Sequence, residues 1–134
     1  MTKTQRYIFD SHVRKEELLQ IKFGLMGQLL RRDKVKGIVD KYNWQSLYIY
    51  GGGYLGLQAY DAFGHFIDMA GIIDQTGELL LPRDDIDTFL PQDLAKLEDD
   101  LPIIITPLEY ACAIRNDLLK FRSEERIYYL NELF

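Results

Sequence analysis

The sequence predicts one small α/β domain, in which a parallel sheet of about four strands has helices on both faces and follows an N-terminal helix or helical hairpin. Three observations lead to this fold class. Short apolar runs alternate with helical patterns from residue 46 onward, as in chains built from repeated strand–helix units. A glycine-rich turn joins the first of these runs to a helix. Finally, 134 residues with 47% hydrophobic side chains suit one domain with one core.

Residues 1–44 are expected to form the N-terminal helical segment. Apolar residues recur at helical spacing between Leu18 and Leu30. Two glycines within this run weaken it, because each costs roughly 1 kcal/mol relative to alanine inside a helix. Asp33 is a candidate N-cap for a second short helix that extends to Tyr42. A leucine and methionine stripe of this kind is more typical of a core or a partner interface than of a cofactor site.

Residues 45–134 contain the alternating pattern. The expected strands are residues 47–50, 66–73, 103–105 and 126–130, with 79–81 as a further short candidate. The expected helices are residues 54–63, which Gly64 ends, 91–98, which begin with a proline, and 106–122. The last of these helices should begin with a capping box at Thr106-Pro107-Leu108-Glu109. Residues 74–77 have the composition of a turn.

The glycine turn is the main candidate for a binding site. Residues Gly51-Gly52-Gly53-Tyr54-Leu55-Gly56 fit the pattern G-x-G-x-x-G, directly after a strand and at the start of a helix, which is the context that the pattern requires. In such a turn Gly51 permits the sharp bend, Gly53 lets a pyrophosphate approach the backbone, and Gly56 lets the helix pack close to the strand. The free N–H groups and partial positive charge of that helix end favour an anion.

Two further residues are candidates for the same site. Asp74 lies 18 residues beyond Gly56, at the end of the second strand, where an acidic residue can accept hydrogen bonds from an adenosine ribose. An acid there disfavours a 2′-phosphate and so favours NAD over NADP. The alternative is that Asp74 only begins the turn. Thr106 ends the third strand, at the same rim of the sheet, although capping a helix would also explain it.

Composition excludes several classes of protein. The net charge of −5 argues against nucleic-acid binding. The single cysteine, Cys112, allows no internal disulfide and no thiolate metal cluster. No apolar run approaches the roughly 18 residues of a membrane helix, and the N-terminus does not resemble a signal peptide, so a cytoplasmic protein is expected.

The charges are unevenly spread along the chain. Residues 14–41 hold eight Lys/Arg against four Asp/Glu, whereas residues 84–100 hold seven acids against Lys96. Solvated helical faces would explain both regions. Alternatively, the two regions attract each other, within one chain or between two copies.

The run from Tyr48 to Gly56, together with Ala70-Gly71-Ile72-Ile73-Asp74, resembles a family of Rossmann-type nucleotide-binding modules. These modules occur at the front of bacterial surface-polysaccharide enzymes such as nucleotide-sugar epimerase/dehydratases and sugar O-acyltransferases, and beside some methyltransferases. Residues 102–107 and 126–130 resemble the C-terminal part of such modules. The resemblance covers roughly residues 45–131.

The resemblance implies nucleotide binding but no catalytic machinery. Epimerases of this type need a Tyr-x-x-x-Lys pair, and no tyrosine here has a lysine four residues on. The acyltransferases carry their chemistry in a separate domain. We therefore expect a stand-alone nucleotide-binding module in polysaccharide or nucleotide-sugar metabolism, with NAD(H) as the leading ligand. The alternative is a degenerate Rossmann fold that acts as a non-catalytic interaction subunit, through a homodimer or a partner enzyme at residues 14–42. A minimal oxidoreductase completed by a partner chain is a third possibility, which the missing acid/base pair disfavours.

Overall fold

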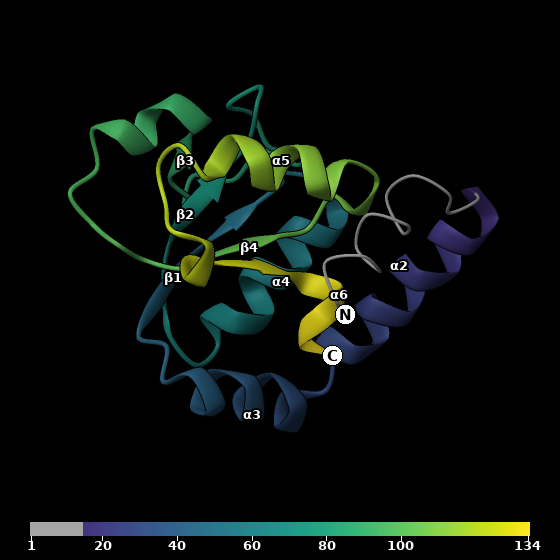
Figure 1. Ribbon diagram of the computed structural model, residues 1–134. Coiled ribbons are helices and arrows are strands. Elements are labelled where there is room, and N and C mark those ends of the chain that lie inside the picture. Colours follow the sequence, from purple (N-terminus) through teal and green to yellow (C-terminus); the bar gives the residue numbers. More distant parts are fainter. Residues whose placement is uncertain (1–14) are drawn as a thin grey trace.

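A computed structural model describes residues 15–134, which form a five-stranded parallel sheet between two layers of helices (Figure 1). The strand order is β3-β2-β1-β4-β5. The strands are β1 (Ser46–Tyr50), β2 (Asp68–Ile73), β3 (Thr88–Phe89), β4 (Ile103–Ile105) and β5 (Ile127–Tyr129). The predicted parallel α/β fold is confirmed and fits a small Rossmann-like domain, with one strand more than expected.

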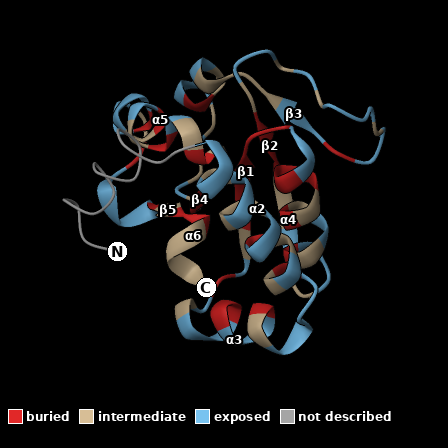
Figure 2. Ribbon diagram, turned by 90° about the vertical axis from the view of Figure 1, so that its right-hand side faces the viewer, coloured by how far each residue is buried: buried red, intermediate tan, exposed pale blue. Residues whose placement is uncertain are grey.

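Each face of the sheet carries its own apolar cluster. One face is covered by α2 (Lys15–Leu29), α3 (Arg32–Tyr42) and α4 (Tyr54–Gly64), and the other by α5 (Ala111–Leu118) and the short 3-10 helix η1 (Pro91–Ala95). Side chains of β1 alternate between them: Leu47 and Ile49 join the first cluster, and Tyr48 and Tyr50 join the second. Figure 2 shows buried residues of the central strands between the partly exposed helices. Because β1 is covered on both faces, its apolar run is continuous, as the sequence indicated.

The N-terminal helical hairpin is confirmed, but its second helix begins differently from the expectation. Helix α3 starts at Arg32 with Arg31 as its N-cap, and no side chain of the described residues caps it. The prediction of Asp33 as the N-cap was therefore wrong, although its carboxylate still lies in the first turn, where it complements the helix dipole. Buried side chains of α2 and α3, such as Leu25 and Val35, belong to the same cluster as Phe63 of α4.

The second half of the chain departs from the predicted boundaries. Residues 79–81, which the structure describes in full, form no strand, and the edge strand beside β2 is β3. The expected helix 91–98 is only the short η1. In place of one helix over 106–122 there are η2 (Leu108–Tyr110) and α5, which ends at Leu118. The chain finishes with η3 (Glu124–Arg126), β5 and a short α6 (Leu130–Leu133).

The capping box predicted at Thr106 does not form. Pro107 precedes η2, and no side chain of the described residues caps that helix. The Thr106 hydroxyl instead donates a hydrogen bond to the Tyr50 carbonyl at 2.7 Å, so it ties the end of β4 to the end of β1. Threonine hydroxyls bond nearby backbone groups in this way, and here the backbone group belongs to the neighbouring strand.

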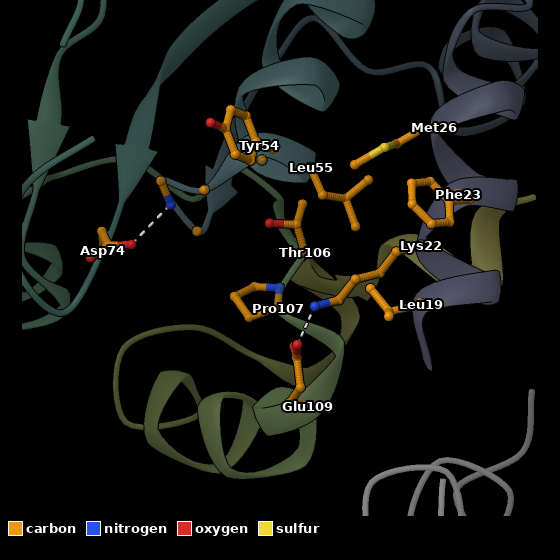
Figure 3. A pocket seen from close by; sticks show the side chains of 14 residues that line it. Leu19, Lys22, Phe23, Met26, Tyr54, Leu55, Asp74, Thr106, Pro107 and Glu109 are labelled. Atoms are coloured by element: carbon orange, nitrogen blue, oxygen red, sulfur yellow. Dashed lines mark hydrogen bonds and ion pairs between the residues drawn. The ribbon is translucent and has the colours of Figure 1, made fainter. Parts of the chain in front are cut away.

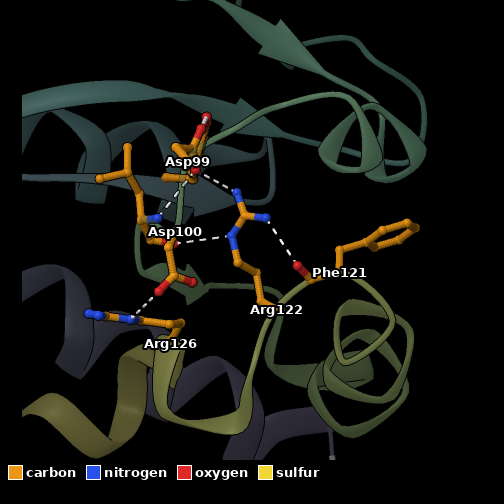
Figure 4. A network of polar contacts seen from close by, with 7 residues as sticks. Asp99, Asp100, Phe121, Arg122 and Arg126 are labelled. Carbon is orange, nitrogen blue, oxygen red and sulfur yellow. Dashed lines mark hydrogen bonds and ion pairs between the residues drawn. The ribbon is translucent and has the colours of Figure 1, made fainter.

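A buried arginine holds the start of β4 against α5 (Figure 4). Arg122 Nη2 donates to Asp99 Oδ1 at 2.5 Å, and its other nitrogens donate to the carbonyls of Phe121 and Leu101. The Tyr48 hydroxyl donates to Asp99 Oδ2 at 2.5 Å, and burial together with this hydrogen bond raises the pKa of Tyr48 well above its usual value. The network satisfies the buried guanidinium, whose side chain is only 3% exposed.

Three carboxylates of the acidic region, residues 84–100, pair with arginines outside the basic region, residues 14–41. Asp99 pairs with Arg122, Asp100 with Arg126, and Asp85 with Arg83, all in the second half of the chain. These three acids therefore do not support the alternative that the two regions attract each other within one chain.

Candidate functional site

The sequence places three candidate residues directly after three aligned strand ends. Tyr50, the last residue of β1, is in register with the last residues of β2 and β4. Gly51, Asp74 and Thr106 therefore follow at one edge of the sheet. The strand order also reverses at β1, because β2 and β3 lie on one side of it and β4 and β5 on the other. In open α/β sheets this switch point, at the carboxyl edge, is where ligands bind.

Gly51 and Gly56 determine the path of the turn between β1 and α4. Gly51 has φ +114°, in the region that favours glycine, and its N–H donates to the Ile73 carbonyl at 2.8 Å. At Gly56 an added Cβ would lie 1.9 Å from the Gly51 carbonyl oxygen. The first turn of α4 thus packs directly on the backbone that leaves β1. This close approach aims the start of the helix at the switch point.

The middle of the turn has one covered residue and one open residue. At Gly52 an added Cβ would lie 2.7 Å from the Glu78 carbonyl oxygen, and the Gly52 carbonyl accepts the Leu80 N–H at 2.8 Å. The loop after β2 therefore lies on Gly52. Gly53 is exposed, and a Cβ there would meet nothing within 4 Å. It is the N-cap of α4, with no side-chain cap from the described residues, so the helix end faces open space.

A cavity of about 350 Å³, here called the α2 cavity, opens at this turn. All eight residues predicted for the site line it: Gly51, Gly52, Gly53, Tyr54, Leu55, Gly56, Asp74 and Thr106. Of these, Thr106 contributes little surface, since it is only 3% exposed. Figure 3 shows Leu55 of α4 facing Phe23 and Met26 of α2 across the cavity.

Sequence reasoning missed the wall that α2 supplies. Leu19, Lys22, Phe23 and Met26 line the cavity opposite the glycine turn, and Pro107 and Glu109 close it below β4. One sequence feature could have indicated this wall: the apolar residues of α2 cover more of the helix surface than one contact with the core needs. Leu25 and Leu29 are buried in the core, whereas Leu19 and Phe23 are 52% and 67% exposed. Apolar residues on a second face of α2 were available for another contact.

An ion pair spans the cavity between α2 and the segment after β4. Lys22 Nζ is paired with Glu109 Oε1 (Figure 3). Burial alone would raise the pKa of Glu109. The hydrogen bond with Lys22, a backbone hydrogen bond and the charge of Lys22 together outweigh burial, so the pKa lies below its usual value. Among the described residues that line the cavity, Lys22 is the one cation, beside the two acids Asp74 and Glu109.

Asp74 has the turn role that was one of its two expected alternatives. Its Oδ1 accepts the Thr76 N–H at 2.9 Å and the Thr76 hydroxyl at 2.7 Å. Its Oδ2 accepts the Gly52 N–H at 2.9 Å, which ties β2 to the glycine turn. A carboxylate offers about four acceptor positions, and these three bonds use three of them. One position on Oδ2 is left, so the turn role does not exclude contact with a ligand hydroxyl.

A second cavity, of about 290 Å³, lies on the α5 side of the same edge and shares Asp74 and Pro107 with the first. Tyr50 and Tyr110 contribute aromatic rings to it. Burial, and then the charges of Asp74 and Asp117, raise the pKa of Tyr50 to about 12. Its hydroxyl therefore stays protonated at neutral pH and is able to donate a hydrogen bond. The two cavities are therefore neighbours at the carboxyl edge of the sheet.

No family model matches the chain, and neither a curated protein nor a solved structure shows significant similarity to it. In residues 15–134 no helix has the length and apolar character needed to cross a membrane.

Proposed function

We propose that this protein binds a nucleotide through its phosphates, at the start of α4 in the α2 cavity. The observation that carries the proposal is Gly53, an exposed glycine at a helix N-terminus without a side-chain cap, on the wall of a cavity at the switch point of the sheet. Free N–H groups and the helix dipole at such an end favour a phosphate. Without a Cβ at Gly53, a phosphate oxygen is able to approach the backbone closely.

NAD(H) is the leading ligand of the proposal. The two neighbouring cavities share Asp74 and Pro107, an arrangement that suits a ligand with two bulky ends joined by a pyrophosphate. The remaining acceptor position on Asp74 suits a ribose hydroxyl, and the negative charge there disfavours a 2′-phosphate. A role in polysaccharide or nucleotide-sugar metabolism rests on the resemblance described above, so UDP-sugars belong in the same set of test ligands.

The first experiment is thermal unfolding of the purified protein with NAD, NADH, UDP-glucose, CoA and S-adenosylmethionine, each followed by calorimetric titration. One site at a hundredfold excess over the dissociation constant adds about 2.7 kcal/mol, which for this size of domain is a shift of several degrees. A shift with one ligand supports nucleotide binding and identifies the cofactor. No shift and no heat with any of them at millimolar concentration would refute the proposal.

The variant Gly53→Ala separates binding from stability. The new methyl group meets no protein atom within 4 Å, and the extended backbone of Gly53 suits alanine, so the loss of stability is expected to stay at or below about 1 kcal/mol. The methyl group would nevertheless stand where a phosphate approaches the N–H groups. Losing one charge-assisted hydrogen bond weakens binding by about tenfold or more. Gly37→Ala, on an exposed face of α3 away from the cavity, is the matched control.

A second function, that of a non-catalytic interaction subunit, is favoured by exposed apolar residues on the N-terminal hairpin. Leu30 is 76% exposed and Phe23 is 67% exposed, and both lie within residues 14–42. Light scattering of the wild type and of Phe23→Asp and Leu30→Asp variants tests it. Self-association that these substitutions abolish would support the interaction role. A wild type that stays monomeric at high concentration, with the same scattering mass in both variants, would count against association through this face.

A further inference from the structure

We infer that Lys22 of α2 is a phosphate-binding residue of this site and that the Glu109 carboxylate is paired with Lys22 until the nucleotide enters. The inference rests on the proposed function and adds a specific cation, from a helix outside the strand–helix units, to the glycine turn. Its ligand class is a nucleotide that carries a diphosphate or pyrophosphate group.

The geometry places Lys22 across the α2 cavity from the glycine turn. Lys22 and the residues of the turn line the same space, and the lysine side chain points into the gap between α2 and the segment after β4 (Figure 3). Its partner there is the Glu109 carboxylate. A carboxylate is an oxyanion, so the site already holds the cation in contact with a group that resembles part of a phosphate.

The ion pair is weak enough to be exchanged. The side chains of Lys22 and Glu109 are 27% and 34% exposed, so water reaches both groups, and a partly exposed pair of this kind stabilises the fold only modestly. A phosphate offers Lys22 more negative charge and more acceptor oxygens than the carboxylate does. On release, Glu109 can turn toward solvent, which removes its charge from the neighbourhood of the phosphate.

The charges of the lining explain why this cation is needed. Asp74 already contributes one negative charge beside the turn, and Glu109 contributes another. The dipole of α4 alone corresponds to about half a positive charge, which does not balance an acid at close range. Among the described lining residues Lys22 supplies the remaining positive charge, so anion binding at this turn should depend on it.

The test is calorimetric titration of NAD and of inorganic pyrophosphate into the wild type, Lys22→Met, Glu109→Gln and the double variant. Lys22→Met keeps most of the apolar stem and removes the charge. Binding of both probes should weaken about tenfold, as for the loss of a charge-assisted hydrogen bond. Glu109→Gln should tighten binding about threefold, because it removes the competitor, and this gain should largely vanish in the Lys22→Met background.

Matched controls use another lysine–carboxylate pair. Lys36 and Asp40 form an exposed ion pair at 2.7 Å on α3, outside the cavity. Lys36→Met and Asp40→Asn make the same changes in net charge, and affinities equal to the wild type are expected. Thermal unfolding of every variant shows that it is folded before its binding is compared.

Each outcome decides the inference. Loss of affinity in Lys22→Met, with a gain in Glu109→Gln that depends on Lys22, supports it. Binding that is equal in all variants overturns the role of Lys22 but leaves the proposed function intact. A gain in Glu109→Gln that persists in the double variant overturns the exchange, because Glu109 would then act by direct repulsion. If no nucleotide binds to any variant, the proposed function and this inference both fall.

Discussion

The substitution Gly56→Ala tests the close contact between α4 and β1 on which the whole site depends. An added Cβ would lie 1.9 Å from the Gly51 carbonyl oxygen and 2.8 Å from its carbonyl carbon. Ordinary contact begins near 3.4 Å, so the helix would have to move by about 1.5 Å, against backbone atoms that no rotamer change can displace. Overpacking of this kind costs about 1–3 kcal/mol, and we expect the upper end because the obstacle is main chain.

Urea unfolding followed by Trp44 fluorescence measures this loss, since Trp44 is buried in the cluster beneath α3 and α4. A loss of about 3 kcal/mol should lower the urea midpoint by about 1–3 M at the usual slopes. Gly24→Ala and Gly37→Ala are controls with the same chemical change in helices where a Cβ meets nothing within 4 Å. Alanine there should stabilise the protein by about 0.5–1 kcal/mol. If Gly56→Ala unfolds within 0.5 kcal/mol of the wild type, the close packing is not required and the reasoning fails.

Three further predictions concern polar groups. Arg122→Leu should cost about 2–4 kcal/mol in urea unfolding, because it leaves the Asp99 carboxylate without its buried partner, and a smaller loss would mean that water replaces the guanidinium. Asp74→Ala should cost about 1–3 kcal/mol and speed hydrogen exchange at Gly52, whereas Asp74→Asn should recover part of the loss. Folding lowers the pKa of Glu109 from its unfolded value of 4.5, so the charge of Glu109 stabilises the fold at neutral pH. This stabilisation declines as the pH falls below 4.5 and is lost as the pH passes the lower pKa of the folded state. Unfolding curves of the wild type and Glu109→Gln should therefore differ at pH 7 and converge toward pH 3, and a constant difference would contradict this.

The sequence was sufficient where the structure depends on local chemistry or on burial. The run Leu47–Tyr50 could be identified as a buried strand because it is rich in β-branched and aromatic residues and glycines follow it. The turn could be recognised because Gly51 and Gly56 have to be glycines for reasons of conformation and space. All eight residues proposed for the site line one cavity, since residues after aligned parallel strands meet at one edge.

Other features depended on contacts between distant segments. Thr106 has the spacing of a helix cap, but the Tyr50 carbonyl of the neighbouring strand lies within reach, and this partner does not appear in the local sequence. The two residues of β3 carry no strand pattern, and they are extended because they pair with Ile72 and Ile73. The leucines at 79–81 have the composition of a strand, but they lie in a loop. The Leu80 N–H of this loop donates to the Gly52 carbonyl, a contact that the local sequence does not reveal.

The contribution of α2 to the cavity shows how one helix can serve two surfaces. Leu25 and Leu29 face the core, and they fix the helix beside α4. The neighbouring face then presents Phe23 and Lys22 toward the turn, at a position that the core contact has already determined. Helical periodicity predicts the first of these faces, because burial repeats along the helix. It cannot predict what the second face meets, since that depends on the sheet edge formed by residues up to 109. The same dependence makes α2 the element through which variation would change the proposed site without disturbing the sheet.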